Sequence, residues 1–341
     1  MERLLLALIA LLPDSFFSLC YGLKPVVIDG QTLNSKARLL CDIDWKTATP
    51  VRETPVETTR ANMERLAGAL AGKRPKLKSV QNIEIPTDFG ALPARLYKPD
   101  NNPSLPVLVY YHGGGYIRGS LNSHDGLCAR LAKYGGFAVL SVEYRLAPEH
   151  KFPAAIDDAI NAFNWAVEQG ASLGLDPSNV AVGGDSSGGC LAAAVAQQAK
   201  SKGDAQPVFQ MLLYPTLDAH LSATSYQLFE EGYFLTYDRI RDYRDMYLNN
   251  ASERGDFRAS PILNSDLTGL PPALIITAGF DPLRDEAESY GKALQGAGVA
   301  VGTVRFPSMV HGFMSMTALL PQADKAVHQA ADALRHVFNQ D

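Results

Sequence analysis

Two adjacent serines, Ser186 and Ser187, follow an apolar run in the segment VAVGGDSSGG, residues 180–189. A serine hydroxyl is a weak nucleophile at neutral pH, so serine chemistry needs a base, an acid that orients the base, and donors for the oxyanion. A G-x-S-x-G turn presents such a serine between a strand and a helix, and its flanking positions must be small. Both positions are glycine, Gly184 and Gly188, only when the motif is centred on Ser186. The spacing therefore predicts Ser186 as the nucleophile.

A glycine-rich loop, HGGG at 112–115, directly follows another apolar run. Glycine lets backbone N–H groups turn toward one point, so we expect the N–H groups of Gly113, Gly114 and Ser187 to bind the oxyanion. The alternative interpretation is a phosphate-binding loop. Arg118 opposes it, because this arginine stands where a G-x-G-x-x-G motif counted from Gly113 requires its last glycine.

A base and an orienting acid are found further along the chain. Of the seven histidines, only His311 lies in a loop after a late apolar run, in FPSMVHGF, and it is the predicted base. His112 is expected to hydrogen-bond within its own loop. Asp281 in AGFDPLRDE is the predicted orienting acid, whereas Asp285 is expected to be helical already. The order Ser186, Asp281, His311 is that of α/β-hydrolases, and chymotrypsin-like proteases use the order His, Asp, Ser.

These residues must be positioned by a regular set of strands and helices. Two runs separated by a turn, 80–85 and 91–97, predict a hairpin. Six nearly continuous apolar runs predict strands buried on both faces, at 107–111, 137–144, 180–184, 209–214, 273–279 and 301–306. Helical patterns lie between them, at 124–134, 154–169, 188–200, 284–296 and 322–338. The alternation predicts an α/β fold, with a mostly parallel eight-stranded sheet, an antiparallel start and helices on both faces.

Two segments, residues 1–50 and 216–262, do not fit this alternation. Ligands of open α/β sheets bind beyond the carboxyl ends of the strands, and the second segment leaves from such an end. We predict that the two segments together form a cap over the site. The hydrolase core then comprises residues 51–215 and 263–341.

Composition and charge limit the partners of the chain. With 341 residues, 46% of them hydrophobic, it is globular and buries a sizeable core. A net charge of −5 gives no basic field, so nucleic acid is not expected as a partner. The cysteines lie far apart and form no CxxC pair, which indicates neither a zinc site nor a disulfide framework: Cys20, Cys41, Cys128 and Cys190.

The amino-terminal segment, residues 1–20, allows two interpretations. Residues 4–12 are an apolar run of signal-peptide length behind Arg3, too short to span a bilayer. Glu2 and a weak cleavage site at 18–20 oppose removal. The favoured interpretation is a retained segment that packs on the protein or touches a membrane surface, in a cytoplasmic protein, and export is the alternative.

HGGG, GDSSGG, DPL and HGF, together with YRLAPEHKFPAA at 144–155, resemble the hormone-sensitive-lipase family of α/β-hydrolases, in its bacterial esterase branch. The resemblance covers the chain from residue 80 onward. It implies a carboxylic-ester hydrolase for short to medium acyl chains, without metal or cofactor, and a homodimer is plausible on this ground alone. It also implies a cap formed by the amino terminus and an insertion after the sixth strand.

The residues that match the family motifs are Ser186 for the nucleophile, Asp281 for the acid, His311 for the base, and Gly113 and Gly114 for the oxyanion glycines. The family's elbow usually reads GDSAGG, so Ser187 replaces an alanine. Two other functions stay open: an amidase or peptidase on the same fold, and a non-catalytic small-ligand binding protein of the kind in which the catalytic histidine is lost.

Overall fold

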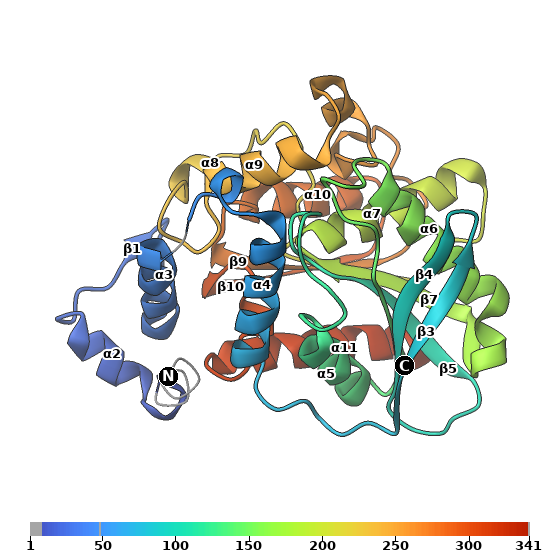
Figure 1. The fold of residues 1–341 in the computed structure, drawn as a ribbon, viewed down its shortest axis with the longest axis horizontal. Helices are drawn as coiled ribbons and strands as arrows, with labels where there is room; N and C mark the ends of the chain where they lie inside the picture. Colours follow the sequence, from blue (N-terminus) through green and yellow to red (C-terminus); the bar gives the residue numbers. More distant parts are fainter. Residues whose placement is uncertain (1–8, 48, 340–341) are drawn as a thin grey trace.

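One eight-stranded sheet forms the centre of the molecule (Figure 1). The computed structural model describes residues 9–47 and 49–339. The strand order is β10-β9-β8-β7-β5-β6-β4-β3. Its strands are β3 (Ser79–Thr87), β4 (Gly90–Lys98), β5 (Leu105–Tyr111), β6 (Ala138–Val142), β7 (Leu175–Asp185), β8 (Gln210–Leu213), β9 (Ala273–Phe280) and β10 (Val301–Val310). β4 pairs antiparallel with β3 and with β6, and the other neighbours are parallel. The predicted fold class is confirmed.

Helices cover both faces of this sheet (Figure 1). Alternate residues of β5 belong to different core clusters, with Val109 in one and Leu108 in the other. One cluster packs against α6 (Ala154–Gln169), α7 (Ser187–Lys202) and α10 (Arg284–Gly296), and the other against α5 (Asp125–Gly135) and α11 (Pro321–Asn339). The strands β5, β6, β8 and β9 are buried on both faces, which explains their nearly continuous apolar runs. The prediction of burial on both faces is wrong for 301–306, because β10 lies at the edge of the sheet and exposes Thr303 and Arg305.

The two segments outside the alternation are built from short elements. The first contains α2 (Asp14–Cys20), β1 (Val27–Ile28), β2 (Gln31–Thr32) and α3 (Ser35–Thr47), and it is followed by η1 (Val51–Glu53) and α4 (Val56–Leu70). The second contains α8 (Ser225–Leu228), α9 (Tyr237–Tyr247), η3 (Ala251–Gly255) and η4 (Pro261–Leu263).

Ion pairs join these two segments. Asp44 of the first segment has its Oδ2 2.8 Å from Arg239 Nη1 of the second. Arg52, just beyond the predicted end of the first segment, has its Nε 2.7 Å from Asp242 Oδ1. A second pair of Arg52 reaches Asp245 at 2.9 Å. The segments thus contact each other, and the boundaries of the cap stay a prediction.

The apolar run 4–12 lies only partly within the described residues, since residues 4–8 fall outside them. Ile9 is buried and Leu11 is exposed. Within residues 9–47 and 49–339, no helix combines the length and apolarity needed to cross a bilayer. Membrane-surface contact, cytoplasmic location and dimerisation stay predictions.

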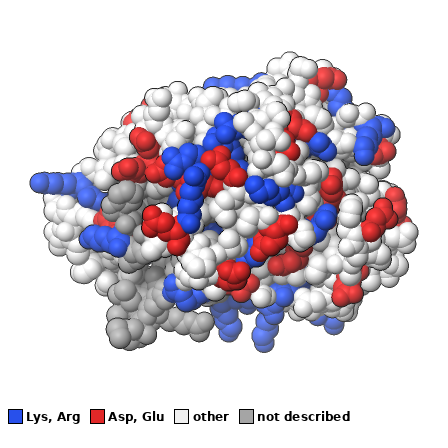
Figure 2. Space-filling model, turned by 45° about the horizontal axis from the view of Figure 1, so that its top comes forward, with Lys and Arg blue, Asp and Glu red and all other residues white. Residues whose placement is uncertain are grey.

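Charges of both signs are mixed over the face drawn in Figure 2, where Lys and Arg alternate with Asp and Glu. The four cysteines are free thiols, of which only Cys20 is exposed. Among the described residues, no group of His, Cys, Asp and Glu side chains is arranged to hold a metal ion.

Candidate active site

Ser186 occupies a strained turn between β7 and α7, with φ 55° and ψ −119°. A positive φ is costly for a residue with a side chain and is maintained only where the surroundings enforce it. The enforcement is steric, because a Cβ at Gly184 would overlap the backbone of Gly188 and Tyr111, and a Cβ at Gly188 would overlap the Tyr111 carbonyl. The turn brings Ser186 to the wall of a cavity.

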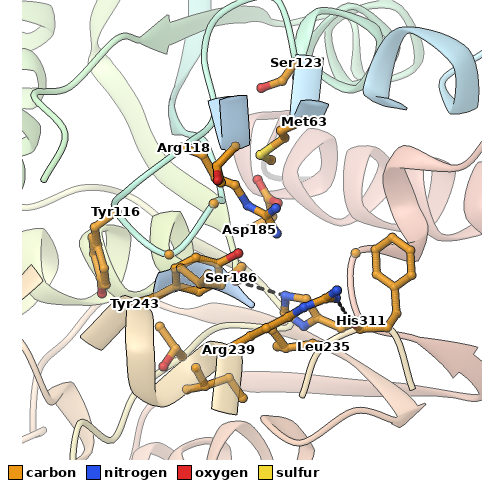
Figure 3. A pocket seen from close by; sticks show the side chains of 18 of the residues that line it. Met63, Tyr116, Arg118, Ser123, Asp185, Ser186, Leu235, Arg239, Tyr243 and His311 are labelled. Atoms are coloured by element: carbon orange, nitrogen blue, oxygen red, sulfur yellow. Dashed lines mark hydrogen bonds between the residues drawn. The ribbon is translucent and has the colours of Figure 1, made fainter. Parts of the chain in front are cut away.

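Asp281 and His311 lie next to Ser186 because the parallel strands β7, β9 and β10 have their carboxyl ends on the same side of the sheet. His311 Nε2 lies 3.0 Å from Ser186 Oγ, and His311 Nδ1 lies 2.8 Å from Asp281 Oδ2 (Figure 3). A carboxylate can only accept, so the geometry assigns the proton to Nδ1 and leaves Nε2 to accept the serine hydroxyl. The three residues form one continuous chain of hydrogen bonds.

Asp281 is held in place from a second side. Its side chain is fully buried, and its Oδ1 accepts the Leu283 N–H at 2.9 Å. The Tyr214 ring packs against the His311 imidazole in an edge-to-face arrangement, with the ring centroids 5.0 Å apart. Both contacts fix the orientation of the imidazole toward Ser186, which is what a general base requires.

The HGGG loop differs from the sequence prediction at Gly113. The Gly113 N–H donates to the buried Asp185 Oδ1 at 2.9 Å, and Gly113 is not among the described residues that line the cavity, so this N–H does not face the site of the oxyanion. Gly114 and Gly115 have φ values of 132° and 65°, and both line the cavity beside Ser186. The assignment of Gly113 as an oxyanion donor is therefore wrong, and the loop offers Gly114 and Gly115 instead.

Ser187 is linked to this loop through its side chain. The residue is fully buried, and its Oγ accepts the Gly115 N–H at 3.0 Å. An alanine at this position would leave that N–H without this partner. The sequence signal for the contact is the serine that replaces the usual alanine of the elbow.

The side chain of Asp185 holds the HGGG loop in place. It accepts hydrogen bonds from Tyr110 and Gly113, and His124 Nε2 lies 3.1 Å from its Oδ1. Burial alone would raise the pKa of Asp185, but the charge interaction and hydrogen bond with His124 and the other two hydrogen bonds hold this pKa below its usual value. The carboxylate therefore stays charged and fixes Gly113.

His112 contributes to the same support and is no candidate base. Burial and the neighbouring His124 lower the pKa of His112 to about 3, so the imidazole is neutral. Its Nδ1 lies 3.0 Å from the Gly113 carbonyl oxygen, as the sequence analysis expects for a bond within its own loop. The Tyr144 hydroxyl donates to the His112 carbonyl at 2.7 Å.

The cavity beside Ser186 has a volume of about 330 Å³. It is lined by α4 and by the segment that includes α9, with apolar side chains such as Met63, Leu235 and Tyr243 (Figure 3). The helix α4 falls in the predicted core range 51–215, yet it forms a wall of the cavity. Charged groups line it as well: Arg65, Arg118, Arg239, Arg244, Asp44 and Asp185.

A family model described as the alpha/beta hydrolase fold matches residues 108–315. The carboxylic ester hydrolase LipN of Mycobacterium tuberculosis is 40% identical to the chain over 320 residues, which is 92% of this chain and 85% of that protein. The chain belongs to the α/β-hydrolases, in their hormone-sensitive-lipase-like carboxylesterase branch. This α/β-hydrolase is also 38% identical to the ethyl acetate hydrolase of Pseudomonas putida over 291 residues, 84% of this chain and 92% of that protein.

Solved structures agree with this assignment. The hyperthermophilic esterase of the archaeon Pyrobaculum calidifontis matches the α/β-hydrolase with a TM-score of 0.86 and 37% identity, over 90% of this chain and 99% of that chain. The ester hydrolase EH1AB1 from the metagenome of Lake Arreo has a TM-score of 0.86 and 38% identity, over 89% of this chain and 98% of that chain. The predictions of fold, family and enzyme class are confirmed.

Proposed function

We propose that this α/β-hydrolase cleaves esters of short- to medium-chain acids through an acyl-enzyme on Ser186. The observation that carries the proposal is the unbroken hydrogen-bond chain from Asp281 through His311 to Ser186, at the wall of a cavity. In the first half-reaction, His311 Nε2 takes the serine proton while Oγ attacks the ester carbonyl carbon. His311 then gives this proton to the leaving alcohol. Water attacks the acyl-enzyme in the same way and restores Ser186.

The oxyanion of each tetrahedral intermediate needs donors that are in place before the reaction. The N–H groups of Gly114, Gly115 and Ser187 are proposed for this role. Support comes from the position of both glycines along the cavity beside Ser186, and from Ser187 beginning α7, where the helix dipole favours negative charge.

The acyl-length preference is supported by the size of the cavity. Small-molecule sites in proteins span about 300–1,000 Å³, and this cavity lies near the lower end with about 330 Å³. A series of p-nitrophenyl esters from acetate to dodecanoate tests the preference. The expected kcat/KM is highest between butanoate and octanoate and falls steeply at dodecanoate. Equal rates on dodecanoate would contradict the proposed length limit.

The nucleophile is tested by covalent labelling. A fluorophosphonate probe is expected to add one label to the protein by intact mass, and Ser186→Ala is expected to abolish both the label and ester hydrolysis. Ser187→Ala is the matched control, because this serine is adjacent but has no bond to His311. Labelling that survives in Ser186→Ala would exclude the assignment.

The same purified protein can be used to test the two other functions, amide hydrolysis and ligand binding without turnover. The p-nitroanilide of butanoic acid, compared with its p-nitrophenyl ester, distinguishes an amidase from an esterase, and the ester is expected to react much faster. A ligand-binding protein without turnover is opposed by the 3.0 Å contact of His311 Nε2 with Ser186 Oγ.

A further inference from the structure

Arg118 has a guanidinium group that the cavity leaves without a partner. The residue lines the cavity, and its Nε is buried without a hydrogen-bond partner. Within the described residues, its side chain makes neither a hydrogen bond nor an ion pair, whereas its backbone N–H donates to the Gly114 carbonyl. A partly buried cation in this state gains from any anion that enters, because the low dielectric strengthens the attraction.

The acids that line the cavity are already engaged elsewhere. Asp44 pairs with Arg239 at 2.8 Å. Asp185 is occupied by His124 and by the donors described above. Arg244, another lining arginine, pairs with Asp245 at 2.9 Å. Among the described residues, neither of these lining carboxylates forms an ion pair with Arg118.

An aromatic ring lies next to this guanidinium. Arg118 Cζ lies 5.1 Å from the centroid of the Tyr243 ring, a cation–π contact that uses none of the guanidinium N–H groups as a hydrogen-bond donor to a carboxylate. In Figure 3, Arg118 lies with Met63 and Asp185 on one side of Ser186, and Leu235 and Arg239 lie on the other side. A planar guanidinium whose N–H groups have no hydrogen-bond acceptor among the described residues matches the geometry of a carboxylate.

We propose that Arg118 binds a carboxylate of the substrate, so that the preferred substrates are esters that also carry a free carboxylate. This inference rests on the proposed ester hydrolysis at Ser186. The carboxylate can belong to the acid part, as in a half-ester of a dicarboxylic acid, or to the alcohol part, as in an acylated hydroxy acid. In the first case, hydrolysis consumes one water and yields an alcohol and a dicarboxylate.

Two substrate pairs that differ in charge but little in shape test the proposal. Monoethyl glutarate is compared with ethyl pentanoate for a charge on the acid part, and 4-acetoxybutanoate with butyl acetate for a charge on the alcohol part. The measured quantity is the ratio of kcat/KM for the charged ester to that for the neutral ester. It is determined for the wild type and for Arg118→Leu, Arg118→Lys and Arg335→Leu.

One pair is expected to show a ratio that falls about ten- to a hundredfold in Arg118→Leu, the range for a hydrogen bond to a charged group. Arg118→Lys should retain part of the preference, since it keeps the charge but loses the planar fork. Arg335 is exposed on α11, outside the cavity lining, so Arg335→Leu should leave both ratios unchanged. An equal loss for both members of each pair would assign Arg118 a structural role against Tyr243 and overturn the proposal.

Glutarate binding separates this proposal from the proposed function. Calorimetry with glutarate requires no turnover, and we expect binding to the wild type that is weakened by added salt and lost in Arg118→Leu. Absence of glutarate and 4-hydroxybutanoate binding to the wild type would overturn the carboxylate site even if neutral esters are hydrolysed. If glutarate binds but no ester is hydrolysed, the proposed function would be contradicted and the carboxylate site at Arg118 would be retained.

Discussion

The backbone N–H of Gly115 donates to the side-chain oxygen of Ser187 across 3.0 Å, which ties the glycine loop to the turn that carries Ser186. In the free protein, this hydroxyl holds one of the donors proposed for the oxyanion. The substrate's oxyanion must displace it before Gly115 can contribute to the transition state.

Ser187→Ala is therefore expected to retain activity and to raise kcat/KM for p-nitrophenyl butanoate by up to about tenfold. The reason is that a net hydrogen bond of about 0.5–1.5 kcal/mol no longer competes for the Gly115 N–H. Steady-state kinetics of the purified variant measure the effect, and Ser186→Ala gives the rate of hydrolysis that does not depend on Ser186. A loss of more than tenfold would mean that the hydroxyl orders the loop rather than occupying it.

Asp281→Asn is expected to lower kcat about 10⁴-fold with a small change in KM, because the amide no longer holds the Nδ1–H tautomer of His311. The matched control is Asp285→Asn, the other acid of the same segment, which pairs with Arg284 at 2.7 Å. Single-turnover kinetics with a p-nitrophenyl ester report the chemical step directly. Comparable losses in both variants would contradict the assignment of Asp281.

Asp185→Asn is expected to destabilise the protein by about 1.5–3 kcal/mol at neutral pH, since a charged acceptor of several hydrogen bonds is replaced by a neutral one. Asp185 has a depressed pKa in the folded state, so its contribution is present at neutral pH and is lost as the pH falls through that pKa. Urea unfolding of wild type and variant should thus differ at neutral pH and converge in acid. A constant difference at every pH would disagree with a charged Asp185.

Glu286→Gln is expected to flatten the dependence of stability on pH. Glu286 is fully buried, where it accepts hydrogen bonds from the Leu217 N–H and the Tyr226 hydroxyl, each at 2.6 Å. Burial raises its pKa from 4.5 to about 8, so the folded state retains a proton that the unfolded chain has lost. Stability is then highest below the lower value and declines as the pH rises toward about 8.

Glutamine mimics the protonated acid and does not titrate, so the Tm of Glu286→Gln should change little over this pH interval while that of the wild type falls. Glu288→Gln, on the same helix but paired with Arg305 near the surface, is the control and should follow the wild type. If the wild-type Tm rises over the same interval, the raised pKa is contradicted.

The central strands β5, β6, β8 and β9 could be predicted from the sequence because they are buried on both faces and are mostly apolar. The hairpin of β3 and β4 is partly exposed, and it was predicted from the turn between its two strands. The motif residues Ser186, Asp281 and His311 follow β7, β9 and β10, so the common edge of a parallel sheet predicts their meeting. Gly113 could not be predicted in the same way. Its N–H donates to the side chain of Asp185, which lies 72 residues further along the chain.

Two other features had no signature in the sequence. The helix α4 has an ordinary mixed composition, and only its place beside the cavity makes Met63 part of the lining. Arg118 stood out merely because it breaks a phosphate-loop pattern. Within residues 9–47 and 49–339 it forms no ion pair, since Asp44 pairs with Arg239 and Asp185 with His124, and such tertiary contacts cannot be seen in a linear pattern.

The ion pair of Asp44 and Arg239 joins positions 195 residues apart, one from each segment that borders the cavity. The pairs of Arg52 with Asp242 and Asp245 repeat this link. If only one of the two segments is replaced by that of a relative, the charged residues where the segments meet can lose their ionic partners. Chimeras designed for a new substrate range should therefore exchange both segments together, because the two segments form one structural unit although they are far apart in the sequence.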